Sequence, residues 1–279
     1  MSLLDWNSIE NSRHGITDSL KVQYKLNPLQ LSIMDIDYEE FRTKGFVTIR
    51  GAFADKARDI SNEVSAMQSW DERPGAYQMY FEKSIVDGTR LLSRIEKFVQ
   101  YSELLSSVVY DKQLLKAISV LLEGDARLFK EKVIFKQPGG DGFKHHQDQT
   151  AGWSQYSNFF ITALISVDEA TKENGTLEII PHTQKSRKLV SEWTSLNQSE
   201  VDSMDFETID LMPGDIVLFD SYVYHGSYPN LSDRQRRVIY TTYASAELGD
   251  IRDLYYLDKS KSYPQDCERD PDKEYIFRV

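Results

Sequence analysis

The chain has 279 residues, of which 40% are hydrophobic and 12% are aromatic, which is enough apolar material for a sizeable folded core. Its composition lacks the biases of a fibrous protein or a disordered tail, and its single cysteine, Cys267, excludes a disulfide scaffold. The formal net charge of -11 argues against a nucleic-acid partner, because phosphate binding depends on clustered lysine and arginine side chains.

Nothing in the sequence predicts a membrane partner or export. The most apolar run, residues 159–167, is far shorter than the roughly 20 residues that a membrane-spanning helix needs. Asp5 stands where a signal peptide would carry positive charge ahead of an apolar run. We therefore expect a cytoplasmic protein.

The chain shows no internal repeat and no linker-like stretch, so we predict a single domain over residues 1–279. Within it we expect a helical N-terminal part at about 36–125. Apolar residues at three- and four-residue spacing predict helices in YEEFRTKGF, DKARDISNEVSAMQSW, SRIEKFVQYSELLSSVVY and DKQLLKAISVLLEG. Gly124 is expected to end the last of these in a left-handed conformation.

A β-rich core is expected at about 126–247, because the hydrophobic period changes from Leu128 onward. Short runs rich in β-branched and aromatic residues, separated by turn sequences, predict strands in LFKEKVIFKQP, NFFITALISVD, GTLEIIP, GDIVLFD and RRVIYTTYASA. Strands punctuated in this way favour a barrel or a sandwich. Polar residues 186–207 are expected to form a helix and loop over the mouth of a site, and no definite structure is predicted beyond Gly249.

Three residues have the pattern of a metal site. On an extended chain, residues two apart point to the same side, so His146 and Asp148 can grip one ion together. His225, from a later strand, would complete a set of two histidines and one carboxylate that leaves three coordination positions open. Alone, the H-x-D spacing is a weak signal and is more typical of a surface turn. His145 must point to the opposite side of the strand and is expected to pack or to support the ligands.

The motifs around these residues resemble one enzyme family. H-x-D is followed by an N-G turn before an apolar strand, by GDIVLFD, by HGSYPN, and by an arginine eleven residues after His225. This combination, from EEFRTKGFVTIRGAF to RRVIYTTYASA, resembles the phytanoyl-CoA dioxygenase family. The resemblance implies an α+β fold with a double-stranded β-helix (jelly-roll, cupin-like) core and N-terminal helices packed on one sheet. It also implies an iron(II)- and 2-oxoglutarate-dependent dioxygenase that uses O2, with ascorbate as a stimulant.

By the same resemblance, His146, Asp148 and His225 are the iron ligands and the catalytic residues. Arg236 corresponds to the arginine that binds the distal carboxylate of 2-oxoglutarate, a task suited to a planar guanidinium with two parallel donors. Arg234 would share its strand face and Arg237 would point away, so the spacing from His225 is what selects Arg236. The remaining residues that the resemblance places near the co-substrate or in the pocket are Ser227, Lys136 and, with ordinary core packing as its alternative, Trp153.

Two positions bear on what the enzyme would do. Where the family commonly has P-G-S-H, this chain has PHTQ at 181–184, so His182 is at an unusual place and is either a substrate-facing group or a residue without a special role. Asp148 is kept, whereas halogenating relatives replace this carboxylate by a small residue to admit chloride. Hydroxylation of a C–H bond is therefore the expected reaction.

The expected substrate is a small polar metabolite, with 2-aminoethylphosphonate suggested by a resemblance of the LLSRIEKF segment to enzymes that act on it. Expected pocket residues are Tyr77, Tyr80, Arg94, Trp153 and the 186–207 segment. The competing hypotheses are a metal-dependent jelly-roll isomerase and a non-catalytic metal-binding protein. The sequence is compatible with a monomer and with a homodimer.

Overall fold

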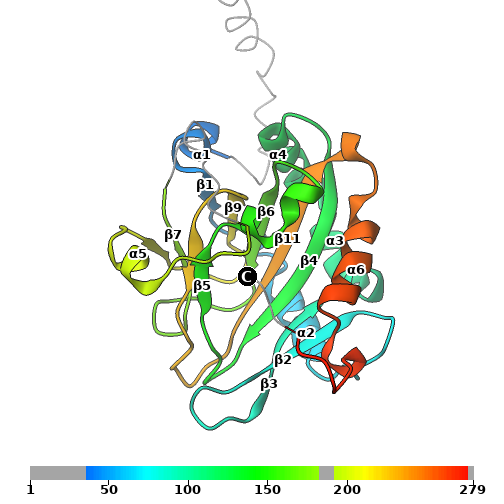
Figure 1. The fold of residues 1–279 in the computed structure, drawn as a ribbon. Helices are drawn as coiled ribbons and strands as arrows, with labels where there is room; N and C mark the ends of the chain where they lie inside the picture. The colour runs from blue at the N-terminus through cyan, green and yellow to red at the C-terminus, as the bar shows by residue number, and fades with distance from the viewer. Residues whose placement is uncertain (1–35, 182–191, 276–279) are drawn as a thin grey trace, which may run out of the picture. The chain divides into compact units, whose positions relative to one another are not determined.

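The structure is a computed structural model, and it describes residues 36–181 and 192–275 (Figure 1). The predicted His182 site therefore lies outside the described residues. The helices are α1 (Tyr38–Lys44), α2 (Ala57–Met67), α3 (Glu103–Val109), α4 (Lys112–Leu122), α5 (Gln198–Asp202) and α6 (Ile251–Ser262). The strands are β1 (Phe46–Ile49), β2 (Gln78–Lys83), β3 (Arg90–Glu96), β4 (Ala126–Lys136), β5 (Phe143–His146), β6 (Ile161–Ser166), β7 (Leu177–Ile179), β8 (Glu207–Ile209), β9 (Ile216–Asp220), β10 (His225–Ser227) and β11 (Arg236–Ser245).

The strands form two antiparallel sheets. Seven strands make the larger sheet, in the order β1-β9-β6-β11-β4-β3-β2, and four make the smaller one, in the order β5-β10-β7-β8. The five predicted strand segments correspond to β4, β6, β7, β9 and β11. The jelly-roll core expected from the sequence is confirmed.

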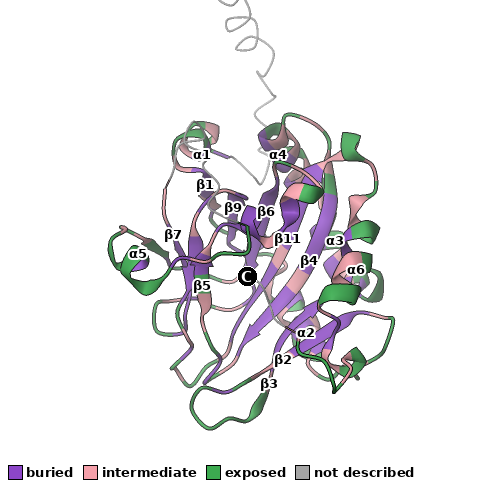
Figure 2. Cartoon of the chain, viewed as in Figure 1, coloured by how far each residue is buried: buried purple, intermediate pink, exposed green. Residues whose placement is uncertain are grey.

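The larger sheet is buried on both faces (Figure 2). On β11, Val238 faces the smaller sheet and joins a core with Leu177 and Ile179 of β7. Its neighbour Ile239 faces the other way, into a second core that the helices complete through residues such as Ile118. The N-terminal helices thus pack on one face of the larger sheet, as predicted, and the other face of that sheet lies against the smaller sheet.

The first half is less helical than predicted. The segment expected as a single helix from Ser93 instead begins within β3, continues through a short 3-10 turn at Val99–Tyr101 and becomes helical only in α3. β3 pairs with β2 on one side and β4 on the other, and these backbone hydrogen bonds decide its conformation. Its polar residues Arg94 and Glu96 are buried.

The predicted end of α4 is wrong by one residue. Glu123 adopts the left-handed conformation, with φ 55°, and Gly124 does not. The backbone N–H of Gly124 still donates to the carbonyl of Ser119 at 3.0 Å, which closes the last turn. The helix begins at Asp111, whose side chain accepts from two backbone N–H groups.

The chain beyond Gly249, for which the sequence predicted nothing definite, forms α6. Arg252 makes a two-pronged ion pair with buried Glu131 of β4, at 2.6 and 3.1 Å. Lys259 pairs with buried Glu96 of β3. Two buried carboxylates therefore fasten α6 beside the larger sheet. Among the described residues, no helix is long and apolar enough to span a membrane.

Candidate active site

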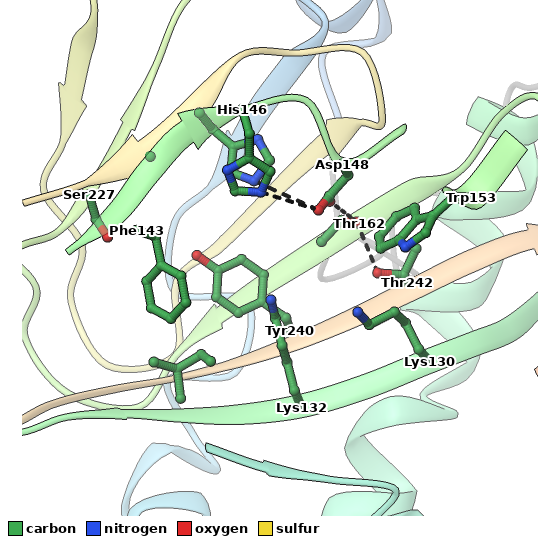
Figure 3. A pocket seen from close by; sticks show the side chains of 13 residues that line it. Lys130, Lys132, Phe143, His146, Asp148, Trp153, Thr162, Ser227, Tyr240 and Thr242 are labelled. Atoms are coloured by element: carbon green, nitrogen blue, oxygen red, sulfur yellow. Dashed lines mark hydrogen bonds and ion pairs between the residues drawn. The ribbon is translucent and has the colours of Figure 1, made fainter. Parts of the chain in front are cut away.

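The three predicted metal ligands come together between the two sheets (Figure 3). His146 ends β5 and His225 begins β10, and these two residues are directly paired across the small sheet. Asp148 follows at the start of a 3-10 turn that brings its carboxylate beside both rings. One ligand atom from each of the three lies within 4.8 Å of the others, a spacing that suits a single ion between them.

Backbone hydrogen bonds orient both histidine rings. The Nδ1 atom of His146 lies 2.6 Å from the carbonyl oxygen of Lys144, and that of His225 lies 3.1 Å from the carbonyl oxygen of Val223. Each Nδ1–H donates to its carbonyl, which leaves the Nε2 lone pair free for a metal. Burial lowers the pKa of His146 to about 3, and it also lowers the pKa of His225, so both rings are neutral at pH 7.

The carboxylate of Asp148 is held by a hydroxyl on the larger sheet. Thr162 of β6 donates to Oδ2 at 3.2 Å, and a 3.0 Å contact to Thr242 of β11 supports Thr162. Oδ1 lies 3.8 Å from Nε2 of His146 and 3.9 Å from Nε2 of His225. Burial favours protonation of Asp148, but the neighbouring histidines and lysines outweigh it and lower its pKa.

His145 lies on the opposite side of β5. Its Nε2 atom is 2.9 Å from the Glu178 carboxylate, and its ring packs against Phe206 with centroids 4.4 Å apart. The side chain of His145 therefore points away from the three ligand atoms, because adjacent residues of a strand face opposite ways.

The three residues predicted to bind the co-substrate also lie together. Arg236 and Lys136 are paired across β11 and β4, and the ammonium of Lys136 donates to the hydroxyl of Ser227 at 2.7 Å. Ser227 lines the cavity that contains the metal ligands, while the cavity lining does not include Arg236 and Lys136. Burial and the adjacent Arg236 lower the pKa of Lys136 to about 6, and burial lowers the pKa of Arg236.

These three side chains fit a carboxylate. Arg236 is 3% exposed, and its terminal nitrogen donates to the carbonyl of Gly175. Within the described residues, its Nε atom is buried and has no hydrogen-bond partner. Two basic groups are thus buried side by side, one with an orphaned donor and the other with a lowered pKa, and a bound anion would satisfy the first and favour the charged form of the second. The distal carboxylate of 2-oxoglutarate would supply that anion, and the histidine–carboxylate set fits iron(II).

A second cavity, of about 540 Å³, also reaches His146 and Asp148. We call it the outer cavity, and we call the one that Ser227 lines the metal cavity. Trp153 and Arg94 line the outer cavity, as predicted, and Trp193 does so from the described end of the 186–207 segment. Tyr77 does not, because it packs against Trp70 with ring centroids 4.5 Å apart. Tyr80 is also excluded from the lining; it is 1% exposed.

Several residues that line the two cavities were not predicted from the sequence. Lys130 and Lys132 share a strand face with Lys136, so the period of two along β4 was a usable signal for them. No sequence period indicated the residues that α6 contributes, because their position in the outer cavity depends on long-range ion pairs. These residues are Tyr255, Asp258, Lys259 and Ser262.

The comparisons with known proteins agree with this geometry. The family described as "Phytanoyl-CoA dioxygenase (PhyH)" matches residues 41–238. A 2-aminoethylphosphonate dioxygenase from an uncultured bacterium (HF130_AEPn_1) is 35% identical, over 85% of this chain and 91% of that protein. A methylphosphonate hydroxylase from Gimesia maris is 29% identical, over 85% of this chain and 90% of that protein.

Solved structures agree on the fold. The apo form of EctD from S. alaskensis superposes with a TM-score of 0.65 at 18% identity, covering 77% of this chain and 79% of that one. From the family match, the 35% identical relative and the clustered histidine–carboxylate set, we conclude that the chain belongs to the phytanoyl-CoA dioxygenase family and is a dioxygenase that depends on iron and 2-oxoglutarate.

Proposed function

We propose that the protein hydroxylates a C–H bond of a small organic phosphonate, with 2-aminoethylphosphonate as the first compound to test, and releases succinate and carbon dioxide. Two relatives that match most of the chain are named for phosphonates. The outer cavity adds a physical reason. Its lining carries four cationic and four acidic side chains, and Arg94 and Lys259 pair with Glu96, whereas Lys130 and Lys132 form no ion pair within the described residues. A phosphonate is an anion that these two lysines would attract.

The observation that carries the reaction type is a three-ligand cluster with a buried arginine–lysine pair behind Ser227, which lines the cavity of the cluster and accepts from Lys136. We assign iron(II) to the cluster and the distal carboxylate of 2-oxoglutarate to the pair. The assignment uses His146, Asp148 and His225 for the metal and Arg236, Ser227 and Lys136 for the co-substrate.

Iron(II), together with 2-oxoglutarate and O2, supplies the oxidising chemistry that breaks the C–H bond. The chain's own contribution is positioning and exclusion of water. Carbonyl acceptors lock the two imidazoles with Nε2 inward, and Thr162 holds one oxygen of Asp148 while the other faces the histidines. Asp148 would hold the metal through its carboxylate and would leave no room for a halide in that place, which favours hydroxylation.

The test is succinate formation by anaerobically purified protein supplied with iron(II), ascorbate, 2-oxoglutarate and O2. The panel contains 2-aminoethylphosphonate, methylphosphonate, amino acids, betaines and acyl-CoA thioesters. We expect phosphonates to stimulate succinate formation, with a product heavier by one oxygen atom, and ascorbate to increase the yield. His146→Ala removes a ligand and should abolish both products, whereas Lys116→Gln, at an exposed position on α4, should change neither.

Stimulation by betaines or acyl-CoA thioesters alone would refute the substrate class. Tight zinc binding without succinate under any condition would instead favour a metal-dependent isomerase or a non-catalytic metal-binding protein.

A further inference from the structure

Two lysines of β4 face the metal ligands from the larger sheet (Figure 3). Lys130 is only 8% exposed, and its ammonium lies 4.9 Å from the ring centre of Trp153 and 5.1 Å from that of Tyr255. The ammonium of Lys132 lies 4.8 Å from the ring centre of Tyr240. Both side chains line the metal cavity and the outer cavity at once. They therefore stand at the junction of the two.

Neither ammonium has a hydrogen bond or an ion pair within residues 36–181 and 192–275. The other cations of the outer cavity differ, because Arg94 and Lys259 both pair with Glu96. Two like charges two residues apart on one strand face repel each other, and burial adds to the cost. Burial, together with Lys130, lowers the pKa of Lys132 to about 8. Asp148 and Glu96 attract both ammonium groups without contacting them, and an anion bound directly at the pair would add to that attraction.

The distal carboxylate of 2-oxoglutarate does not account for the Lys130–Lys132 pair. Arg236 lies opposite Lys136 in the strand register, whereas Tyr240 lies opposite Lys132 and Thr242 opposite Lys130. Four and six residues along a strand correspond to about 13 and 20 Å. A carboxylate bound at Arg236, as proposed for the distal end of 2-oxoglutarate, would therefore lie beside Lys136 and far from both Lys130 and Lys132 along the strands.

We infer that Lys130 and Lys132 form an anion site for the phosphonate head of the substrate, separate from the Arg236–Lys136 pair that binds the co-substrate. The inference rests on the proposed function and assigns the residues that select its substrate. A phosphonate can carry two negative charges and three acceptor oxygens, and two lysine ammonium groups match it in charge. The rest of the substrate would extend into the outer cavity, under Tyr255 of α6.

The experiment measures binding to protein loaded with Ni(II), which does not turn over, and saturated with 2-oxoglutarate. The probes are 2-aminoethylphosphonate, methylphosphonate and inorganic phosphate, titrated by calorimetry. Lys130→Gln and Lys132→Gln should each weaken binding of all three about 10- to 100-fold, the usual range for one charge-assisted contact. The affinity for 2-oxoglutarate should stay within about twofold of wild type.

Three further measurements provide the controls. Lys132→Arg retains the charge and should recover part of the affinity, and the exposed Lys116→Gln should bind as wild type does. Thermal unfolding should show both glutamine variants folded, because an unpaired buried charge is removed.

Wild-type affinity for the probes in both glutamine variants would overturn the inference. So would weaker binding of 2-oxoglutarate in place of the probes, since it would assign the lysines to the co-substrate. The proposed function fails separately, if wild-type protein binds phosphate through these lysines and yet oxidises no phosphonate.

Discussion

Three arginines stand close together at the start of β11, and the structure gives each different surroundings. Arg234 is exposed and meets Glu169 at 3.3 Å. Arg237 is buried, and its guanidinium pairs with Asp168 at 2.7 Å and donates to serines of α2. Arg236 alone of the three keeps a buried nitrogen without a partner among the described residues. The co-substrate role predicted from spacing therefore has a physical basis that the other two arginines lack.

Arg236→Lys tests this role at the scale of one residue. Lysine keeps the charge but loses the planar fork and the fixed contact to the carbonyl of Gly175. We expect the Kd for 2-oxoglutarate to rise about 10- to 100-fold, or about 1.4–2.8 kcal/mol, with little change in metal affinity. Calorimetry on the Ni(II) protein measures both constants.

Arg234→Lys, two residues away and exposed, is the matched control and should leave the Kd unchanged. Equal behaviour of the two variants would remove Arg236 from the co-substrate site.

At the scale of an element, the N-G turn before β7 supports the co-substrate site. Gly175 has φ +74°, and its carbonyl accepts from Arg236. A Cβ atom at this position would lie 2.3 Å from the carbonyl oxygen of Tyr228 and 3.0 Å from the ammonium of Lys136. The glycine thus allows the turn to approach β10 and β4 closely.

Gly175→Ala should therefore weaken 2-oxoglutarate binding as well as stability. Gly88→Ala is a close control, because Gly88 also has a positive φ, +77°, but nothing lies within 4 Å of its Cβ position. We expect the control to cost about 1 kcal/mol of unfolding free energy, from backbone strain alone. Gly175→Ala should cost more and should raise the Kd for 2-oxoglutarate at least about 10-fold. Urea unfolding and calorimetry measure the two effects, and equal losses in both variants would contradict the packing argument.

At the scale of the whole molecule, the site joins the two sheets. His146 and His225 belong to the smaller sheet, whereas Arg236 and Lys136 belong to the larger one. Metal and co-substrate bound at these residues, as proposed, would stabilise only the folded arrangement.

Adding Ni(II) and 2-oxoglutarate should raise the unfolding temperature. At 100 times the Kd, a ligand stabilises the folded state by about 2.7 kcal/mol, which corresponds to about 5–10 °C for a protein of this size. A chelator should reverse the shift, and His146→Ala should lose most of it. Scanning calorimetry measures the change, and an unchanged unfolding temperature for the wild type would contradict binding between the sheets.

The sequence by itself determined the parts of this protein whose signals are local. Alternating apolar residues and bounding turns predicted β4, β6, β7, β9 and β11, and the motif around His146 and Asp148, with His225, predicted a histidine–carboxylate cluster that the fold brings together. The spacing of two residues works because a strand fixes the direction of its side chains. The residues expected to bind the co-substrate also proved to be neighbours, as the motif after His225 implied.

Only the tertiary structure decided what depends on distant partners. β3 is a strand because β2 and β4 flank it, and its Arg94 and Glu96 can be buried because Lys259 arrives from α6. The same packing brings Tyr255 over Lys130. Ion pairs between residues more than a hundred positions apart leave no periodic trace in a sequence, because their energy depends on burial that folding creates. The residues that α6 contributes to the outer cavity could therefore be found only from the fold, whereas the histidine–carboxylate cluster was predicted from a short motif.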